Sequence, residues 1–555
     1  MTTELWNGRV GRRGFLRGAA LGGVGLATAA VIGCGDDDDE PAATATTAPG
    51  ATAAPSTSTP EVVKTITVTQ GRANKPPSMD PNTTALAPAE FFAVFDPLTR
   101  LDEGPDGTSP GPALAESWEL DADKRWVFKL REAEWSDGQP FTAEDVKFSF
   151  EYFANADNKS SLISRVNTIE QTEVMDPRTV RITNKSGIDP IMPRRGALPF
   201  ILPKHIFEDA SKDAKTFMAA TPVGTGSYQV TNFVSDASVT FEASPNSWRG
   251  NKGVIGGTTR WIAESTTLLA ALETGDLDIV QGIPSSENAR VRGFKNITLQ
   301  AANPLGAQHW DHANRLSEGH PANDKRVRQA LTLAIDSPTI AEVIYSGLAE
   351  VAPGQITHKA TFGFDPSLQA TKFDPDGARQ LLKDAGFANG FDFQIDSQMV
   401  GDTKPMVEAT AGMWDDIGLK TSIVPLEINI WRDRLYGRTT APWPGTFNVG
   451  WVAYLYDASF LYDWYNGGTA YRMWDVDDPT QKEFDGHYKA ALAEPDDEKR
   501  LGLFQNIAKL FSFDGASPVT QTVYVNSEDA WRSDKITNHF PGKFPEMRFD
   551  EIVSA

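Results

Sequence analysis

The sequence predicts an α/β protein with two or three lobes and mixed sheets. The roughly 490 residues that follow residue 61 have an ordinary globular composition, and this length exceeds what one hydrophobic core supports. Patterns typical of strands and patterns typical of helices both occur in this part of the chain, and they do not alternate strictly. A fully parallel α/β fold would alternate them, so mixed sheets are expected.

The strand pattern is clearest near the start of the globular part. Residues 62–69 read Val-Val-Lys-Thr-Ile-Thr-Val-Thr, so polar and apolar side chains alternate from Thr65 onward. Alternation with a period of two places apolar side chains on one face, which predicts a half-buried strand.

Helix starts are marked by capping residues. Thr142 and Asp145 have the spacing of a capping box, which predicts that a helix begins there. Asp324 precedes a segment with apolar residues at helical spacing, which predicts a second helix. Asp374 followed by Pro375 predicts a third, and Gly386 is a suitable residue to end it.

The first 33 residues predict an export signal. They hold four arginines and one glutamate, and the sixteen residues 18–33 carry no charge. A run of this length is shorter than the roughly 20 residues needed to cross a bilayer core. A permanent transmembrane helix is therefore the less favoured alternative.

Cys34 directly follows this uncharged run and is the only cysteine. A single cysteine excludes disulfides within the chain, and the neighbouring glycines and aspartates give no basic surroundings that would activate a thiol. Its position favours a lipid anchor.

Residues 41–60 contain only Pro, Ala, Thr, Ser and Gly, so they cannot bury enough apolar surface to fold and are expected to form a tether.

The charge balance bears on the class of partner. The chain has a formal net charge of −22, and residues 1–33 contribute +3, so the remainder carries −25. Binding to phosphate backbones requires basic patches, and no Lys/Arg cluster of useful length lies beyond residue 33. Nucleic acid is therefore not expected as a partner.

Two short motifs resemble known export signals. Residues 11–17, Gly-Arg-Arg-Gly-Phe-Leu-Arg, resemble the twin-arginine motif, with Gly11 where Ser or Thr is usual. Residues 31–34, Val-Ile-Gly-Cys, resemble a bacterial lipobox. The resemblance implies cleavage before Cys34, acylation of its thiol, and a protein anchored by lipid on the outer side of the cell membrane.

Motifs along the globular part occur in the order typical of one family. They are Phe95–Arg100, Leu114–Trp118, Trp126–Arg131, Trp135–Gly138, Phe141–Val146, Leu202–His205, Pro222–Tyr228, Asn246–Gly250, Gly275–Asp278, Asp324–Asp336 and Asp374–Phe387. In this order they resemble the family 5 extracellular solute-binding proteins, the peptide, dipeptide and nickel-binding type that serves ABC importers.

The resemblance implies a periplasmic-binding-protein-like clamp of two lobes with an extra domain inserted in the first. It implies capture of a small solute, delivery to ABC permease subunits, and no enzymatic activity, cofactor or bound metal; we also expect a monomer. The expected divisions are residues 1–33 as the signal peptide, 34–61 as the lipidated cysteine and tether, 62–110, 206–305 and 520–555 as lobe I, 111–205 as the inserted domain, and 306–519 as lobe II.

The solute site is expected in residues 450–461, which resemble the segment that lines the cleft in this family. Peptide binders of the family usually have an aspartate, which pairs with the α-ammonium group of the ligand, where this chain has Tyr454. The expected solutes are therefore not restricted to peptides with a free amino terminus, and they include peptide-like, cationic and sugar-like molecules. Residues 443–474 contain eleven aromatic residues, and the faces of Trp451, Tyr454 and Tyr456 suit a planar or cationic solute. Asp457 is expected to supply charge. Packing inside the lobe is the alternative for any one of these aromatics.

A second set of candidates lies where the family crosses between lobes. It comprises Trp310, Asp311 and His312. Hydrogen bonding to a solute, a metal site and ordinary packing are the three interpretations, and the spacing of His309 and His312 gives weak support to metal.

Two other classes of function compete. An exported hydrolase would need a nucleophile with its base or paired catalytic carboxylates, and the metalloprotease motif His-Glu-x-x-His does not occur. A sensory binding lipoprotein on the same fold would have the same sequence features as an importer component.

Overall fold

The structure is a computed structural model. It describes residues 66–72, 76, 78–83, 89–101, 110–185, 187–197, 199–211, 213–250, 253–301, 307–311, 319–399, 402–427, 430–431, 445–450, 456–468, 472–525, 528–538 and 549–555. The chain divides into two units, residues 1–61 and residues 62–555. The fold below is that of the second unit.

Lobe I is built on a sheet of seven strands. In pairing order they are β12 (Ile297–Ala301), β19 (Glu528–Arg532), β11 (Ile279–Ile283), β1 (Ile66–Arg72), β10 (Val254–Trp261), β9 (Ser238–Ala243) and β8 (Tyr228–Val234). The first strand, β1, runs parallel to both its neighbours, whereas the other pairs are antiparallel. The expected half-buried strand is thus confirmed for the described residues: Val68, Gln70 and Gly71 are buried, whereas Thr67 is exposed.

Lobe II is built on a second mixed sheet. Its six strands, in pairing order, are β14 (Glu350–Val351), β18 (Val519–Tyr524), β13 (Ala307–Asp311), β17 (Gly445–Gly450), β15 (Asp392–Ser397) and β16 (Lys420–Pro425). The pairs of β15 with β16 and with β17 are parallel. The structure thus confirms the predicted α/β class with mixed sheets.

A third, antiparallel sheet of four strands lies in the chain between the opening of lobe I and β8. In pairing order its strands are β4 (Ala115–Leu120), β5 (Trp126–Leu130), β7 (Thr179–Asn184) and β6 (Ile169–Asp176). Its apolar side chains belong to the same buried cluster as those of lobe I, including Phe128 and Phe549. Two short pairs complete the strands: β2 (Thr99–Arg100) with β3 (Gly111–Pro112), and β20 (Ile536–Asn538) with β21 (Val553–Ser554).

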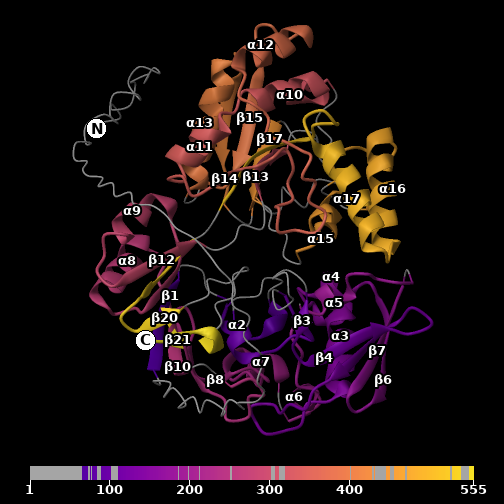
Figure 1. Ribbon diagram of the computed structural model, residues 1–555, viewed down its shortest axis with the longest axis vertical. Coiled ribbons are helices and arrows are strands. Elements are labelled where there is room, and N and C mark those ends of the chain that lie inside the picture. The colour runs from indigo at the N-terminus through magenta and orange to yellow at the C-terminus, as the bar shows by residue number, and fades with distance from the viewer. Residues whose placement is uncertain are drawn as a thin grey trace, which may run out of the picture. The chain divides into compact units, whose positions relative to one another are not determined.

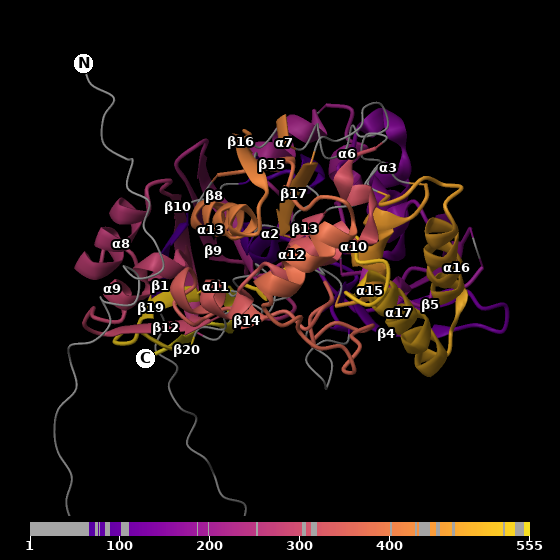
Figure 2. The same cartoon turned by 90° about the horizontal axis from the view of Figure 1, so that it is seen from above.

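Helices pack on these sheets (Figure 1). Lobe I and the inserted domain hold α2 (Ala89–Val94), α3 (Ala143–Ala154), α4 (Ile163–Val166), α5 (Met192–Arg195), α6 (Lys204–Phe207), α7 (Ala214–Ala220), α8 (Ser265–Thr274) and α9 (Asn288–Val291). Lobe II holds α10 (Lys325–Leu333), α11 (Ser337–Val343), α12 (Pro375–Asp384), α13 (Thr403–Asp416), α15 (Ala458–Tyr462), α16 (Pro479–Ala493) and α17 (Asp497–Phe511). Figure 2 shows α13 beside β15 and β16, and α16 beside α17.

The three predicted helix starts are confirmed. Thr142 precedes α3 with a capping box, and Asp145 Oδ2 accepts its backbone N–H at 2.8 Å. Asp324 caps α10 by accepting the N–H of Arg326 at 2.8 Å. Asp374 caps α12 in the same way, and Gly386 follows that helix with φ +93°, a conformation that favours glycine.

The chain passes between the two large sheets twice. It leaves β12 at Ala301 and enters β13 at Ala307, and it leaves β18 at Tyr524 and enters β19 at Glu528. The strands before and after these passages are neighbours in each sheet, because β12 pairs with β19 and β13 pairs with β18. The strand β18 pairs with β13 and β14 within the lobe II sheet.

A buried polar cluster joins distant segments of lobe I. Asp96 is 1% exposed, and its Oδ1 forms an ion pair with Nη2 of Arg249 at 2.9 Å. Its Oδ2 accepts hydrogen bonds from Trp248 Nε1 at 2.9 Å and from the Thr225 hydroxyl at 3.0 Å. Arg249 also pairs with Asp550 at 3.2 Å, near the end of the described chain.

Gly224 and Gly226 lie closely against the end of α2. A Cβ on Gly224 would lie 1.9 Å from the carbonyl oxygen of Val94, and one on Gly226 would lie 2.5 Å from that of Ala93. Glycine is therefore required for the segment before β8 to lie against the end of α2.

We expect Gly224→Ala to lower the free energy of unfolding by at least about 2 kcal/mol, because the backbone of α2 has to move to admit a methyl group. Gly412→Ala is the control: Gly412 lies in α13 with no atom within 4 Å of its added Cβ. That variant should be neutral or more stable by up to roughly 1 kcal/mol, since alanine is the better helix former. Chemical denaturation of both variants tests the pair, and equal stabilities would contradict the expectation.

Candidate functional site

Several residues predicted to bind a solute or lipid lie outside the described residues. These are Trp451, Tyr454, His312 and Cys34. Asp311 is the last residue of β13, but its side chain is also outside the described part. What the structure gives is the position of the residues that flank the predicted segment.

On one side the segment is preceded by β17, which lies inside the lobe II sheet. Gly450 ends this strand and pairs with Gln308 of β13. A Cβ on Gly450 would lie 2.6 Å from Nε2 of Gln308, so the carboxamide of Gln308 lies beside this exposed glycine. The residue before Trp451 is therefore fixed by strand pairing with β13.

On the other side Asp457 is held by three interactions. It is 0% exposed, and its Oδ1 caps α15 by accepting the N–H of Ser459 at 3.0 Å. Its Oδ2 accepts a hydrogen bond from Nη1 of Arg500 at 2.7 Å, from a residue 43 positions later in the chain. Its backbone forms a parallel bridge with Phe362. The carboxylate is thus engaged inside lobe II.

Arg500, on α17, completes this arrangement. Its side chain is 4% exposed, and its guanidinium carbon lies 3.9 Å from the ring centroid of Phe362. A second ion pair joins it to Asp497 at 3.2 Å. The guanidinium of Arg500 therefore stacks on the ring of Phe362 and pairs with the carboxylates of Asp457 and Asp497. These contacts compensate for the burial of its charge.

Tyr456 packs in the core of lobe I and the inserted domain. It is 1% exposed and belongs to the apolar cluster of lobe I and the inserted domain, although it follows β17 of lobe II in the chain. Its φ is +51°, an uncommon conformation for a residue with an aromatic side chain. Its carbonyl accepts the N–H of Phe362 at 2.8 Å, which holds this backbone in place.

Trp310 lies in the other core. It is 0% exposed and packs edge to face on Trp414, with ring centroids 5.1 Å apart. Tyr456 and Asp457, which are neighbours in sequence, are both buried at the end of the predicted solute segment. The ring of Trp310 lies in the interior of lobe II. The alternative of interior packing, left open from the sequence, describes Trp310 and Tyr456 in this structure.

Sequence reasoning did not single out Arg500 or Phe362. Each acts on a partner far away in the chain, and no local pattern connects the pairs. The described residues contain no group of three or more His, Cys, Asp or Glu side chains that could hold a metal ion. Within the same part of the chain, no helix is both long and apolar enough to cross a membrane.

Known proteins resemble the chain in sequence and in fold. Heme-binding protein A of Haemophilus influenzae is 26% identical over 367 residues, which are 61% of this chain and 66% of that protein. Curated relatives are matched over only part of their own length, 55% for the first of them.

Two solved structures of binding proteins have the same fold. CtaP, an ABC transporter substrate-binding protein of Listeria monocytogenes, superposes with a TM-score of 0.76 at 19% identity, over 88% of this chain and 99% of that one. DppA of Helicobacter pylori, solved with the peptide STSA, gives a TM-score of 0.72 at 21% identity, over 89% and 98%. At such identities the likeness establishes the fold.

The family model described as bacterial extracellular solute-binding proteins, family 5, middle part, matches residues 109–472, which is more than half of the chain. This match covers the inserted domain, most of the strands of lobe II and the predicted solute segment. The chain therefore belongs to the family 5 bacterial extracellular solute-binding proteins.

Proposed function

We propose that this protein is the extracytoplasmic solute-binding component of an ABC importer. It captures a small organic solute between its two lobes and delivers it to a membrane permease, and it makes or breaks no bond. The family match over residues 109–472 carries this proposal. The two adjacent passages between the sheets support it, because a paired connection lets two lobes close on a solute while each stays folded.

The proposal includes export and anchoring. The arginines and the uncharged run of residues 1–33 act as a twin-arginine signal, Cys34 carries the lipid, and residues 41–60 tether a monomeric body beside the permease. The support is the sequence alone: one cysteine, directly after the uncharged run and before a segment of Pro, Ala, Thr, Ser and Gly.

We place the solute on the segment between β17 and α15. Trp451 and Tyr454 supply aromatic faces for a peptide-like, cationic or sugar-like solute, and Asp311 and His312 are further candidates. The buried contacts of Tyr456 and Asp457 give these two residues a different role in the proposal, since they hold the end of the segment. Trp310, in β13, has a packing role in the proposal, since its ring lies against Trp414 of α13.

Trp451→Ala tests the position of the site. The full chain with Cys34→Ser is screened by thermal shift against dipeptides, oligopeptides, opines, oligosaccharides and quaternary amines. A bound solute raises the melting temperature by mass action, and Trp451→Ala should abolish the shift while leaving the melting temperature of the empty protein unchanged. Trp474→Ala, in the same aromatic-rich region but beyond the segment, should keep the shift. A shift that survives in Trp451→Ala places the site elsewhere.

Arg500→Met tests the holding role of the buried ion pair. Removal of the cation leaves the Asp457 carboxylate buried without its charge partner, so the free energy of unfolding should fall by about 3 to 5 kcal/mol. The double variant Asp457→Asn with Arg500→Met should recover part of this loss. Denaturant titration measures the free energy of unfolding of the double variant and of each single variant. A loss in the double variant equal to the sum of the losses in Arg500→Met and Asp457→Asn would contradict a specific interaction between the two side chains.

Cys34→Ser tests the anchor. The variant should move from the membrane fraction to the soluble fraction, with its solute affinity unchanged, because anchoring and recognition lie in separate units of the chain. Fractionation of cells that express the two proteins, followed by titration with the solute found in the screen, decides the matter.

A further inference from the structure

Residues 355–365 form a buried loop of lobe II, in the chain between β14 and α12. Its polar residues Gln355, Thr357 and Asp365 are 0%, 0% and 3% exposed. A buried segment outside the sheets can give its backbone groups neither to a ladder nor to water, so these groups need other partners. The partners that the structure supplies show what the 355–365 loop is attached to.

The side chain of Gln355 closes the loop. Its Nε2 donates to the carbonyl of Asp365 at 2.7 Å, and its Oε1 accepts the backbone N–H of Asp365 at 2.9 Å. The carboxamide thus bonds both backbone groups of a residue ten positions later, as a neighbouring strand would. Its Oε1 also accepts the hydroxyl of Thr357 at 2.8 Å. The two ends of the 355–365 loop are therefore held together by one side chain.

Tyr524 attaches the loop to β18. This tyrosine is the last residue of the strand and is 2% exposed. Its hydroxyl lies within hydrogen-bond distance of two carbonyls of the loop, that of Gln355 at 3.0 Å and that of Thr357 at 2.6 Å. Its ring packs edge to face on His358, with ring centroids 4.9 Å apart. The loop is therefore fixed to the strand from which the chain leaves lobe II.

The middle of the loop is attached to the end of the predicted solute segment. The N–H of Phe362 donates to the carbonyl of Tyr456 at 2.8 Å, and the carbonyl of Phe362 accepts the N–H of Ala458 at 2.8 Å. Gly363 has φ +104°, and a Cβ added to it would lie 2.5 Å from that of Ala458. The 355–365 loop thus holds the backbone on both sides of Asp457.

The helix α17 is the third element that holds the loop. Arg500 stacks on the ring of Phe362, as described above. Further along the helix, Nε2 of Gln505 donates to the carbonyl of Phe364 at 3.2 Å. Lys509 forms an ion pair with Oδ2 of Asp365 at 3.5 Å. The loop is therefore fixed on α17 as well as on β18, and residues 456–458 are fixed on the loop.

We propose that the 355–365 loop positions the solute site, and that Gln355 and Tyr524 are its positioning residues. They act on the solute through the backbone of residues 456–458, where the predicted solute segment ends. The inference rests on the proposed function and adds to it the structure that supports the site. A backbone that is held before the solute arrives loses less conformational entropy on binding, so an intact loop raises the solute affinity.

Hydrogen exchange of backbone amides tests this attachment without a solute. Gln355→Met keeps a side chain of similar length and removes both hydrogen bonds to Asp365. We expect the amides of Phe362 and Ala458 to exchange about tenfold faster in this variant, although both donate to residues other than Gln355. Mass spectrometry of peptides that contain these two amides measures the rates in the full chain with Cys34→Ser.

Tyr524→Phe is the second variant. It keeps the ring that packs on His358 and removes only the hydroxyl, so it stays informative even if Gln355→Met is unstable. It should also speed the exchange of the amides of Phe362 and Ala458. Because both changes act through one loop, the double variant should show less than the product of the two single fold-changes.

The same variants test the link to the solute. Titration with the compound that gives the largest thermal shift in the screen should show an affinity weaker by roughly two- to tenfold in Gln355→Met and in Tyr524→Phe. A role in stability alone would lower the melting temperature and leave this affinity unchanged.

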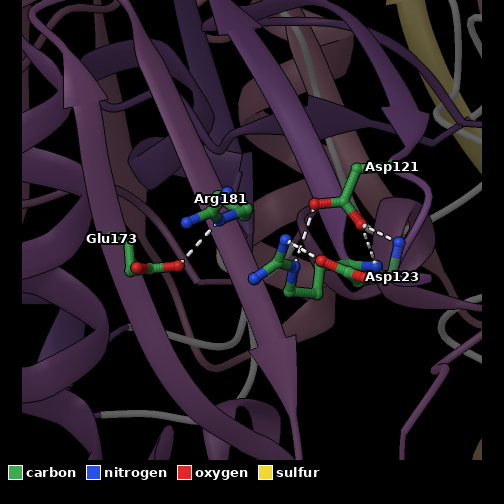
Figure 3. A network of polar contacts seen from close by, with 5 residues as sticks. Asp121, Asp123, Glu173 and Arg181 are labelled. Carbon is green, nitrogen blue, oxygen red and sulfur yellow. Dashed lines mark hydrogen bonds and ion pairs between the residues drawn. The ribbon is translucent and has the colours of Figure 1, made fainter.

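Two control variants separate the loop from a general loss of stability. Gln481 on α16 is also a glutamine with 0% exposure, and its Nε2 donates to the carbonyl of Tyr465 at 3.0 Å, so Gln481→Met is the matched control. Arg181→Gln removes an ion pair with Glu173, 2.7 Å long, in the sheet of the inserted domain (Figure 3). Neither variant should change the exchange of Phe362 and Ala458.

Unchanged exchange of Phe362 and Ala458 in both Gln355→Met and Tyr524→Phe would overturn the proposal. Equal acceleration in Gln481→Met, or faster exchange with unchanged solute affinity, would overturn it as well. A screen in which no compound raises the melting temperature, together with faster exchange in both loop variants, would count against the proposed function and leave the hold of the loop on residues 456–458 established.

Discussion

The organisation of lobe I depends on one buried carboxylate, that of Asp96. A charge with 1% exposure is costly unless it is hydrogen-bonded and paired with an opposite charge; here the indole of Trp248 and the hydroxyl of Thr225 donate to Oδ2, and the guanidinium of Arg249 forms an ion pair with Oδ1. These three partners come from the segments on either side of the β8–β9 hairpin. Through Arg249 the cluster reaches Asp550, so the beginning and the end of the globular part are fixed to one another.

This cluster explains why short motifs identified the fold. Phe95–Arg100, Pro222–Tyr228 and Asn246–Gly250 are three of the motifs that carry the family resemblance, and they meet at Asp96. Gly224 belongs to the same place, where any side chain would strike α2. Local rules also predicted the capped starts of α3, α10 and α12, because a cap depends on residues within one turn.

The candidate site was less accessible to sequence reasoning. The aromatic excess near residue 450 pointed to a region, but exposure decides which rings can touch a solute, and exposure depends on the whole fold. Tyr456 enters the lobe I core and Trp310 the lobe II core, both for reasons of packing that no spacing reveals. An aspartate is a residue type that can bind a solute, so the sequence made Asp457 a candidate. In the structure its carboxylate is held by Arg500, and the position of Arg500 follows from the packing of α16 on α17.

The place of β19 has a consequence for the order of folding. This strand lies between β11 and β12 in the lobe I sheet, although it comes more than 200 residues after them in the chain. All strands of lobe II are translated before it, so lobe II can complete its sheet while lobe I still has two unpaired strand edges facing an empty position. Such edges are sites for wrong pairing. During synthesis lobe I therefore remains the vulnerable half until residue 532 is available, and its assembly is of high contact order and correspondingly slow.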